Sequence, residues 1–363
     1  MAYSVMPGGA SRSEVDAEAV AGTDPKGCPL DTALETPTDP EVERLGALTL
    51  PYGPIADITT RGDVIIAAHY GADAVSLLDA NTLHASGVIP VPGEPFAVAR
   101  TADQVVVATT ATGCDAVSVI DVDRRTVSAV YPLAFSVSAL AVSPNGKRVY
   151  AGRTGDGYAD VAVIDLTAER VGTIDIGSGP GLGLDACVTD PTGTVLYVAT
   201  TDARGSALVV VDTETARVRH RIPVGPPIRD LGCAEDAVFV LTSDRVRGGA
   251  VQVVDLAVGR VTKSVELGAG APTQLVLSSD RTRAYVVDYD RITVLCPASL
   301  ELVNTVAVAP RPSCVAVDDD SDRLYVADYT GTVTTLSVAA AMPLLYSQFV
   351  ATDPLHTLEA ATA

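Results

Sequence analysis

The sequence has no tryptophan, and its only lysines among 363 residues are Lys26, Lys147 and Lys263. Its 25 basic residues face 45 acidic ones, which gives a formal net charge of −20 at pH 7. Most of such a surface repels a phosphate backbone, because like charges raise the free energy of association. We therefore expect no nucleic-acid partner.

Metal-binding and redox motifs are also missing. The chain has four histidines and six cysteines, and no CxxC or HExxH spacing occurs. A chain of this length buries enough core to fold without disulfides. We expect reduced thiols at all six positions, which are Cys28, Cys114, Cys187, Cys233, Cys296 and Cys314.

Long apolar runs are absent as well. No segment approaches the roughly 18 consecutive apolar residues of a membrane helix. The first 20 residues lack the basic region and apolar stretch of a secretory signal. The sequence thus predicts a cytoplasmic protein with no membrane partner.

The chain is instead rich in short apolar runs and turn residues, with 47% hydrophobic residues, 30 glycines and 23 prolines. One pattern, an apolar run that stops at a polar residue, occurs seven times at intervals of 42, 44, 47, 43, 41 and 41 residues. The runs end at Asp79, Asp121, Asp165, Asp212, Asp255, Cys296 and Ser337. A period of about 40 to 45 residues without helical periodicity is typical of four-stranded propeller blades.

Each repeat divides into four expected strands, named A to D. A short inner strand A is followed by a β-branched or aromatic strand B, such as 196–199, and then by the apolar run as strand C. Strand D is half polar, as in 217–222, which suits an outer strand with one wet face. The sequence therefore predicts an all-β fold, a seven-bladed β-propeller of four-stranded antiparallel blades.

The ring of blades must close, because open sheet edges promote aggregation. Residues 44–50 read like a strand D with no blade before them, so we expect this N-terminal strand to pair into the last blade. Residues 343–350 are the competing segment for the same slot. The expected organisation is an N-terminal acidic arm at 1–43, the propeller at 44–350 and a C-terminal tail at 351–363.

The repeat resembles the YVTN-repeat, or YncE-like, propeller family, most clearly at Ala141–Ala151, where a Ser-Pro-Asn-Gly turn leads into Val-Tyr-Ala. The likeness covers about residues 45–338. This chain departs from the family where asparagine is favoured after the Tyr-Val-Ala strand, and has Gly152, Thr200, Asp288 and Asp328 there. The resemblance implies the fold strongly and an activity weakly, since propellers host many functions.

Three patterns that imitate functional sites have a structural interpretation that we favour. The aspartates that end strand C suit turns in which a carboxylate accepts backbone N–H bonds. The glycine-rich segment 177–183 leads into a strand and not into the helix that a phosphate cradle needs. Residues 318–322 begin like a calcium loop, but Arg323 and Tyr329 replace its glycine and glutamate.

Two enzyme classes are disfavoured by motif. No G-x-S-x-G elbow occurs, which excludes an α/β-hydrolase mechanism. The absence of tryptophan counts against quinone-cofactor propellers and WD-type repeats.

The expected site is the axial face, where the D to A and B to C loops gather around the channel mouth. Asp57 and Asp230 break the repeat, and together with Asp185 and His69 they form a candidate site for Ca²⁺ or Mg²⁺, which prefer oxygen ligands. By the repeat pattern, Asp57 and Asp230 take the positions that Val98 and Val315 hold in sister blades. The candidate ligand-binding residues on the same face are His69, Tyr70, Arg153, Arg229, Asp288, Tyr289, Asp328 and Tyr329.

Two functions follow from this face. The first is a binding or scaffold protein that takes a small polar ligand or a protein partner. The alternative is a metal-dependent hydrolase or lyase, because lactonase-like propellers use axial carboxylates and histidine. The alternative without a binding site is that these polar groups are ordinary loop residues that face water and keep the channel mouth soluble.

Overall fold

In a computed structural model, residues 42–101, 104–134, 136–308, 311–318 and 323–338 are described. They form 28 strands in seven four-stranded antiparallel sheets. Residues 1–41 of the predicted arm, the tail, the competing segment 343–350 and most of the calcium-like loop lie outside these residues. None of the described residues forms a helix of the length and apolarity needed to cross a membrane.

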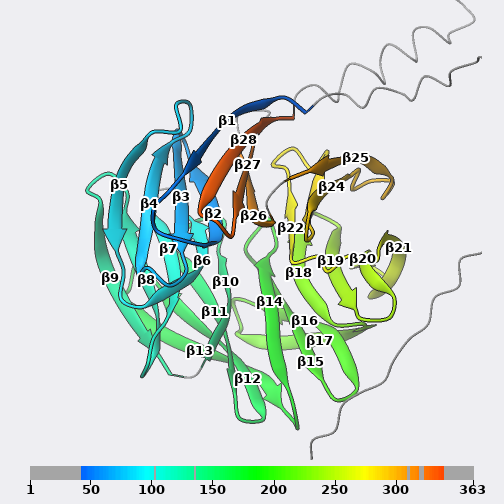
Figure 1. Cartoon of the computed structure of the whole chain (residues 1–363). Helices are drawn as coiled ribbons and strands as arrows, with labels where there is room; N and C mark the ends of the chain where they lie inside the picture. The colour runs from blue at the N-terminus through cyan, green and yellow to red at the C-terminus, as the bar shows by residue number, and fades with distance from the viewer. Residues whose placement is uncertain (1–41, 102–103, 135, 309–310, 319–322, 339–363) are drawn as a thin grey trace, which may run out of the picture. The chain divides into compact units, whose positions relative to one another are not determined.

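The first four blades follow one another along the chain (Figure 1). Blade 1 consists of β2 (Ile55–Arg61), β3 (Val64–His69), β4 (Ala74–Asp79) and β5 (Ala85–Pro90). Blade 2 consists of β6 (Glu94–Arg100), β7 (Val105–Thr110), β8 (Asp115–Asp121) and β9 (Thr126–Leu133). Blade 3 consists of β10 (Ser136–Val142), β11 (Arg148–Gly155), β12 (Tyr158–Asp165) and β13 (Arg170–Ser178). Blade 4 consists of β14 (Gly183–Thr189), β15 (Val195–Asp202), β16 (Gly205–Asp212) and β17 (Arg217–Gly225).

The last three blades complete the set. Blade 5 consists of β18 (Ile228–Cys233), β19 (Ala237–Asp244), β20 (Gly248–Asp255) and β21 (Arg260–Gly268). Blade 6 consists of β22 (Gln274–Leu277), β23 (Ala284–Val287), β24 (Arg291–Leu295) and β25 (Leu302–Ala307). Blade 7 consists of β26 (Pro312–Val317), β27 (Arg323–Asp328), β28 (Thr332–Ser337) and β1 (Arg44–Thr49).

The ring closes through β1, as predicted. This strand pairs antiparallel with β28, with Leu48 opposite Val333 and Thr49 opposite Thr332 (Figure 1). The inner strand β2 of blade 1 also contacts β26 of blade 7. The two ends of the propeller sequence therefore share one sheet.

The core lies between blades and not within one. Seven buried clusters each combine residues of two neighbouring blades; one joins Ile55 and Ile65 of blade 1 to Cys314 and Tyr325 of blade 7. The second and third strands are buried on both faces, which explains their continuous apolar runs. The outer strands alternate in exposure because only one face meets a neighbour.

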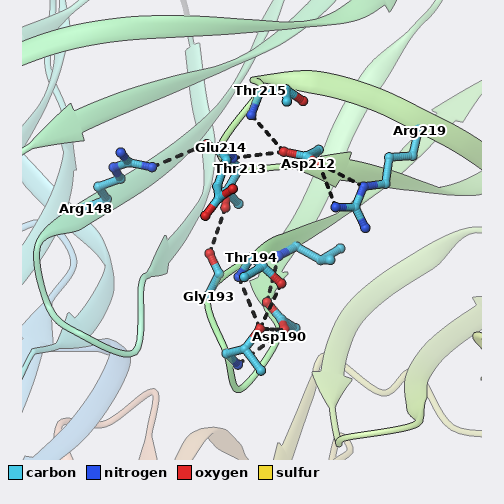
Figure 2. Close-up of polar contacts among 11 residues, drawn as sticks. Arg148, Asp190, Gly193, Thr194, Asp212, Thr213, Glu214, Thr215 and Arg219 are labelled. Carbon is cyan, nitrogen blue, oxygen red and sulfur yellow. Dashed lines mark hydrogen bonds and ion pairs between the residues drawn. The ribbon is translucent and has the colours of Figure 1, made fainter.

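The aspartates that end strand C form turns, as predicted. In blade 4, Asp212 Oδ1 accepts bonds from the backbone N–H of Glu214 and Thr215 at 3.0 and 2.7 Å (Figure 2). Thr213 Oγ1 donates to the Gly193 carbonyl at 2.7 Å and ties this turn to the preceding A to B turn. The other four strand-C aspartates, Asp79, Asp121, Asp165 and Asp255, accept equivalent backbone bonds.

The loops that enter each blade lie beside its B to C loop. Backbone bonds join Tyr70 to Pro54 in blade 1, Ser243 to Pro227 in blade 5 and Tyr329 to Arg311 in blade 7. The glycine-rich segment leads into β14, as predicted. Functional groups on these loops therefore gather at one end of the ring, which we call the axial face.

Candidate functional site

A pocket of about 340 Å³ lies where the inner strands of all seven blades converge. Its polar lining includes Asp57, Ser138, Asp185, Arg229, Asp230, Gln274 and Tyr329. Because every blade contributes at least one residue, this axial pocket is the mouth of the ring's central channel. A second pocket of about 450 Å³ shares Asp57 and Gln274, so these two side chains lie between the two ends of the channel.

One position of the inner strand places polar groups in the channel. Each of the seven inner strands except β22 has a register irregularity near its start, and the residue just after it faces the same position of strand B. In four blades this position holds Asp57, Asp230, Gln274 and Cys314. Their counterparts in blades 2, 3 and 4 are Ala97, Ala139 and Ala186. The sequence alignment with Val98 and Val315 was wrong by one residue, because Pro54 and Pro227 precede their inner strands, whereas Pro95 and Pro312 lie within theirs, at the positions of Ile55 and Ile228.

These polar side chains join neighbouring blades. Asp57 accepts the Ile58 N–H at 2.9 Å with Oδ1 and the Val98 N–H of blade 2 at 2.8 Å with Oδ2. Asp230 accepts the Leu231 and Leu275 N–H groups, both at 2.8 Å, and the second belongs to blade 6. The innermost strands have no further strand to pair with, so each carboxylate satisfies a backbone donor that would otherwise face the channel.

Gln274 continues the same arrangement and was missed by the sequence analysis. Its Oε1 accepts the Val315 N–H of blade 7 at 2.7 Å, and its Nε2 donates to Asp57 Oδ1 at 3.3 Å. Asp230, Gln274 and Asp57 therefore link blades 5, 6, 7, 1 and 2 in sequence; we call these three residues the clamp. The signal that could have revealed Gln274 is its equivalence to the two aspartates.

Burial changes the protonation of the clamp. Both carboxylates are enclosed by protein yet remain accessible from the channel. Burial raises the pKa of Asp57 from 3.8 to about 6, and backbone hydrogen bonds offset part of that rise. Burial also raises the pKa of Asp230 from 3.8 to about 7, with a further contribution from the negative charge of Asp57.

Asp185 and Arg229 lie at the wall of the axial pocket. Asp185 accepts a bond from Thr201 Oγ1 at 2.5 Å. Its pKa is raised by burial, and the Thr201 bond and the Arg229 charge partly offset that rise. These two residues have opposite charge and line one pocket. Asp185 can accept a hydrogen bond from a ligand, and Arg229 can bind an anionic group of the same ligand.

The predicted cation ligands do not gather into one cluster. In the described part of the chain, no three His, Cys, Asp or Glu side chains are close enough to hold a metal ion. The Asp57 and Asp230 carboxylates already accept backbone bonds, and His69 is fully buried with Nε2 2.8 Å from Ser76 Oγ. The arrangement of these groups thus supports a structural role for them better than a Ca²⁺ or Mg²⁺ site.

Three predicted ligand-binding residues have structural partners. Arg153 is buried, and its guanidinium makes a two-pronged contact with Asp160 at 2.7 and 2.8 Å. Asp328 is buried and accepts the Thr330 and Thr332 N–H groups at 2.8 and 2.9 Å. Asp288 is also buried and accepts the Ala271 N–H at 2.8 Å. These side chains shape the loops, and their contact with a ligand stays a prediction.

The predicted tyrosines are exposed. Tyr70, Tyr289 and Tyr329 lie within two residues of the end of strand B in blades 1, 6 and 7, and their exposed fractions are 50%, 56% and 54%. Tyr329 also lines the axial pocket. We call these three residues the tyrosine rim. Large exposed aromatic side chains on loops are typical of binding surfaces.

A second cavity on the axial face, of about 730 Å³, lies between the B to C loops of blades 5 and 6. Its lining contains the predicted residues Arg229, Asp288 and Tyr289. It also contains Arg245 and Arg247, which the sequence analysis did not select because they resemble ordinary loop residues. Arg229 lines this cleft and the axial pocket, so the two cavities are neighbours.

Comparisons with known proteins agree with this architecture. The chain is 48% identical over 316 residues to a seven-bladed beta-propeller protein of Mycolicibacterium smegmatis, covering 86% of each chain. It is 33% identical over 330 residues to seven-bladed beta-propeller protein Rv1057 of Mycobacterium tuberculosis, covering 80% of this chain and 83% of the relative.

Among solved structures, a chain of hydrazine synthase from Kuenenia stuttgartiensis aligns with a TM-score of 0.71 and 19% identity. The alignment covers 81% of this chain and 98% of that chain, and at this identity it shows the fold alone. No family model matches the sequence. With its seven four-stranded sheets and these two mycobacterial relatives, the chain belongs to the seven-bladed β-propeller proteins.

Proposed function

We propose that this propeller is a binding protein whose axial face takes a protein partner. The observation that carries this proposal is the tyrosine rim beside the axial pocket. Three half-exposed tyrosines on adjacent blades offer rigid apolar area with polar tips, and Arg229 lies next to them in the pocket wall. Tyrosine and arginine are the residue types that contribute most to protein interfaces.

A small polar ligand is the second candidate, and the axial pocket favours it. The pocket volume of about 340 Å³ is within the range of small-molecule sites, and its wall offers both Asp185 and Arg229. The same face would serve either ligand class. The repeat motifs further support membership of the YVTN-repeat, YncE-like branch of propellers, which we propose as the chain's subfamily.

The experiment compares two triple variants of the full chain. Tyr70→Ser/Tyr289→Ser/Tyr329→Ser removes the rim, and Val130→Ser/Val171→Ser/Leu302→Ser removes similarly exposed apolar side chains from outer strands. Each immobilised protein is exposed to lysate of its source cells, and the captured partner is then tested for protection of the axial loops in hydrogen exchange. We expect capture to fall about tenfold or more for the rim variant only. Equal capture by both variants would reject the rim as the interface.

The metal-dependent hydrolase or lyase stays a prediction with its own test. Added Ca²⁺ or Mg²⁺ should raise the melting temperature if a cation binds at the axis, and Asp57→Ala or Asp230→Ala should abolish that gain. Melting temperatures that do not change with either ion favour the binding protein.

A further inference from the structure

A difference in strand length creates the cleft between blades 5 and 6. The second and third strands of blade 5, β19 and β20, have eight residues each, whereas β23 and β24 of blade 6 have four and five. The hairpin end at Asp244–Gly248 and the hairpin end at Asp288–Arg291 border the cavity of about 730 Å³. Its lining therefore comes from two hairpins whose strands differ in length and from the inter-blade segment Gly268–Ala271.

Four arginines line this cleft: Arg229, Arg245, Arg247 and Arg291. In the described ranges of the chain, the first three form no salt bridge with any residue. The chain has 45 acidic residues for 25 basic ones, so carboxylate partners are plentiful elsewhere. Positive charge that is gathered without a close ion pair in an acidic protein is suited to an external anion.

The acidic residues of the cleft neutralise this charge only in part. Asp244 accepts the Val246 and Arg247 N–H groups at 2.7 and 3.0 Å, and so holds its own loop. Asp288 is buried, with Oδ1 engaged by the Ala271 and Tyr289 N–H groups at 2.8 and 2.7 Å. Asp290 is exposed, and Arg291 Nε lies 3.5 Å from Asp290 Oδ1 and 3.7 Å from Asp288 Oδ2. The lining thus has four arginines and three aspartates, and among the described residues only Arg291 of the four has a salt-bridge partner.

Glycines make the cleft walls close and rigid. Gly248 has a φ of +83°, and a Cβ there would overlap the Gly268 carbonyl oxygen. A Cβ at Gly270 would overlap the Asp288 carboxylate. Arg311 stacks on Tyr289 with its guanidinium carbon 4.6 Å from the ring centroid, which holds one wall side chain in place. A preorganised cleft loses less entropy when it binds a ligand.

We propose that this arginine cleft binds a molecule that carries at least two anionic oxygen groups, either carboxylates or phosphates. Guanidinium groups match both anions with paired hydrogen bonds. The anion would lie between Arg245 and Arg247 on the blade 5 side and Arg291 on the blade 6 side, with Arg229 toward the axial pocket. The volume admits a compact metabolite or a short acidic stretch of a peptide.

Anion binding by the arginine cleft rests on the proposed binding role of the axial face. Experiments can nevertheless reject the anion site and the partner interface independently of each other. Tyr329 lines the axial pocket and does not line the arginine cleft. Tyr329→Ser should thus leave anion binding unchanged even where it removes partner capture.

The test measures binding of pyrophosphate, citrate and a hexaglutamate peptide to the full chain by isothermal titration calorimetry. Arg245→Gln/Arg247→Gln is the test variant, and Arg217→Gln/Arg260→Gln removes the same charge from exposed outer-strand positions. We expect the test variant to weaken the Kd about tenfold or more and the control to change it little. Preference for pyrophosphate or citrate assigns a free anion, and preference for the peptide assigns acidic side chains of a protein. Equal weakening in both variants, or no binding of any of the three probes to the wild-type chain, would overturn the proposal.

Discussion

Blades 3, 4 and 5 differ from blades 6, 7 and 1 in how they hold together at the axial face. Their second and third strands have eight residues each, against four to six in the other group. The longer strands make more backbone hydrogen bonds within each blade. In the shorter group, the clamp joins the inner strands to one another and to blades 5 and 2, and β1 completes the last sheet.

The tyrosine rim also belongs to the short group, and the arginine cleft lies where the two groups meet. Short strands end early, so their loops leave open space that long hairpins would occupy. The comparison teaches that the repeat supplies the scaffold, while departures from the repeat supply the candidate binding surfaces.

The largest effect should come from removing β1. A chain that starts at Pro51 leaves β28 as an exposed edge and loses the buried Leu50 and the partly buried Leu48 from the cluster between blades 7 and 1. We expect a loss on the order of 5 kcal/mol in the free energy of unfolding, measured by urea denaturation. A synthetic peptide of residues 42–50 should restore stability when it is added in trans. If the shortened chain is as stable as a chain that starts at Val42, closure by β1 contributes little.

The clamp predicts an intermediate effect that depends on pH. The folded-state pKa values of Asp57 and Asp230 are raised to about 6 and about 7, above the ordinary value of 3.8. Between about pH 4 and pH 7 the folded chain therefore binds more protons than the unfolded chain, and the free energy of unfolding falls as pH rises. Allowing for partial access to solvent, we expect this loss to be on the order of 2 kcal/mol.

Two double variants isolate the clamp in urea denaturation at several pH values. Asp57→Asn/Asp230→Asn should flatten the decline between pH 4 and pH 7, because the neutral amides do not titrate. Asp79→Asn/Asp212→Asn is the control, since backbone hydrogen bonds lower the pKa of both residues and their contribution is lost only under more acidic conditions. An unchanged decline in the clamp variant would show that other groups cause it.

The smallest effect should come from the turns at the opposite end of strand C. Asp79 belongs to the short group and Asp212 to the long group, and each holds its turn through backbone N–H bonds. We expect Asp79→Ala and Asp212→Ala to lower the melting temperature by similar, small amounts. The extra Arg219 bond to Asp212 is exposed and adds little (Figure 2). A much larger loss for Asp212→Ala would mean that the two groups of blades also differ away from the axial face.

The fold was predictable because its signals are local and repeated seven times. The apolar runs, the aspartate-held turns and the unpaired strand at 44–50 each follow from short-range patterns, and all three are confirmed. The site was predicted less well. Asp57, Asp185, Asp230, Arg229 and Tyr329 do line one pocket, but His69, Arg153 and Asp328 have buried structural partners.

The partners of these three residues lie only 7, 7 and 2 positions away, within one B to C hairpin each, whereas the contact that involves Gln274 is distant in sequence. The Gln274 side chain meets Asp57, which lies 217 positions away along the chain. The sequence alone determined the number of blades, their strands and the closing element, because alternation of apolar residues and turn chemistry act within a few residues. Only the tertiary structure decided which loop residues face a cavity and which are buried, because register irregularities and contacts between blades set the direction of each side chain.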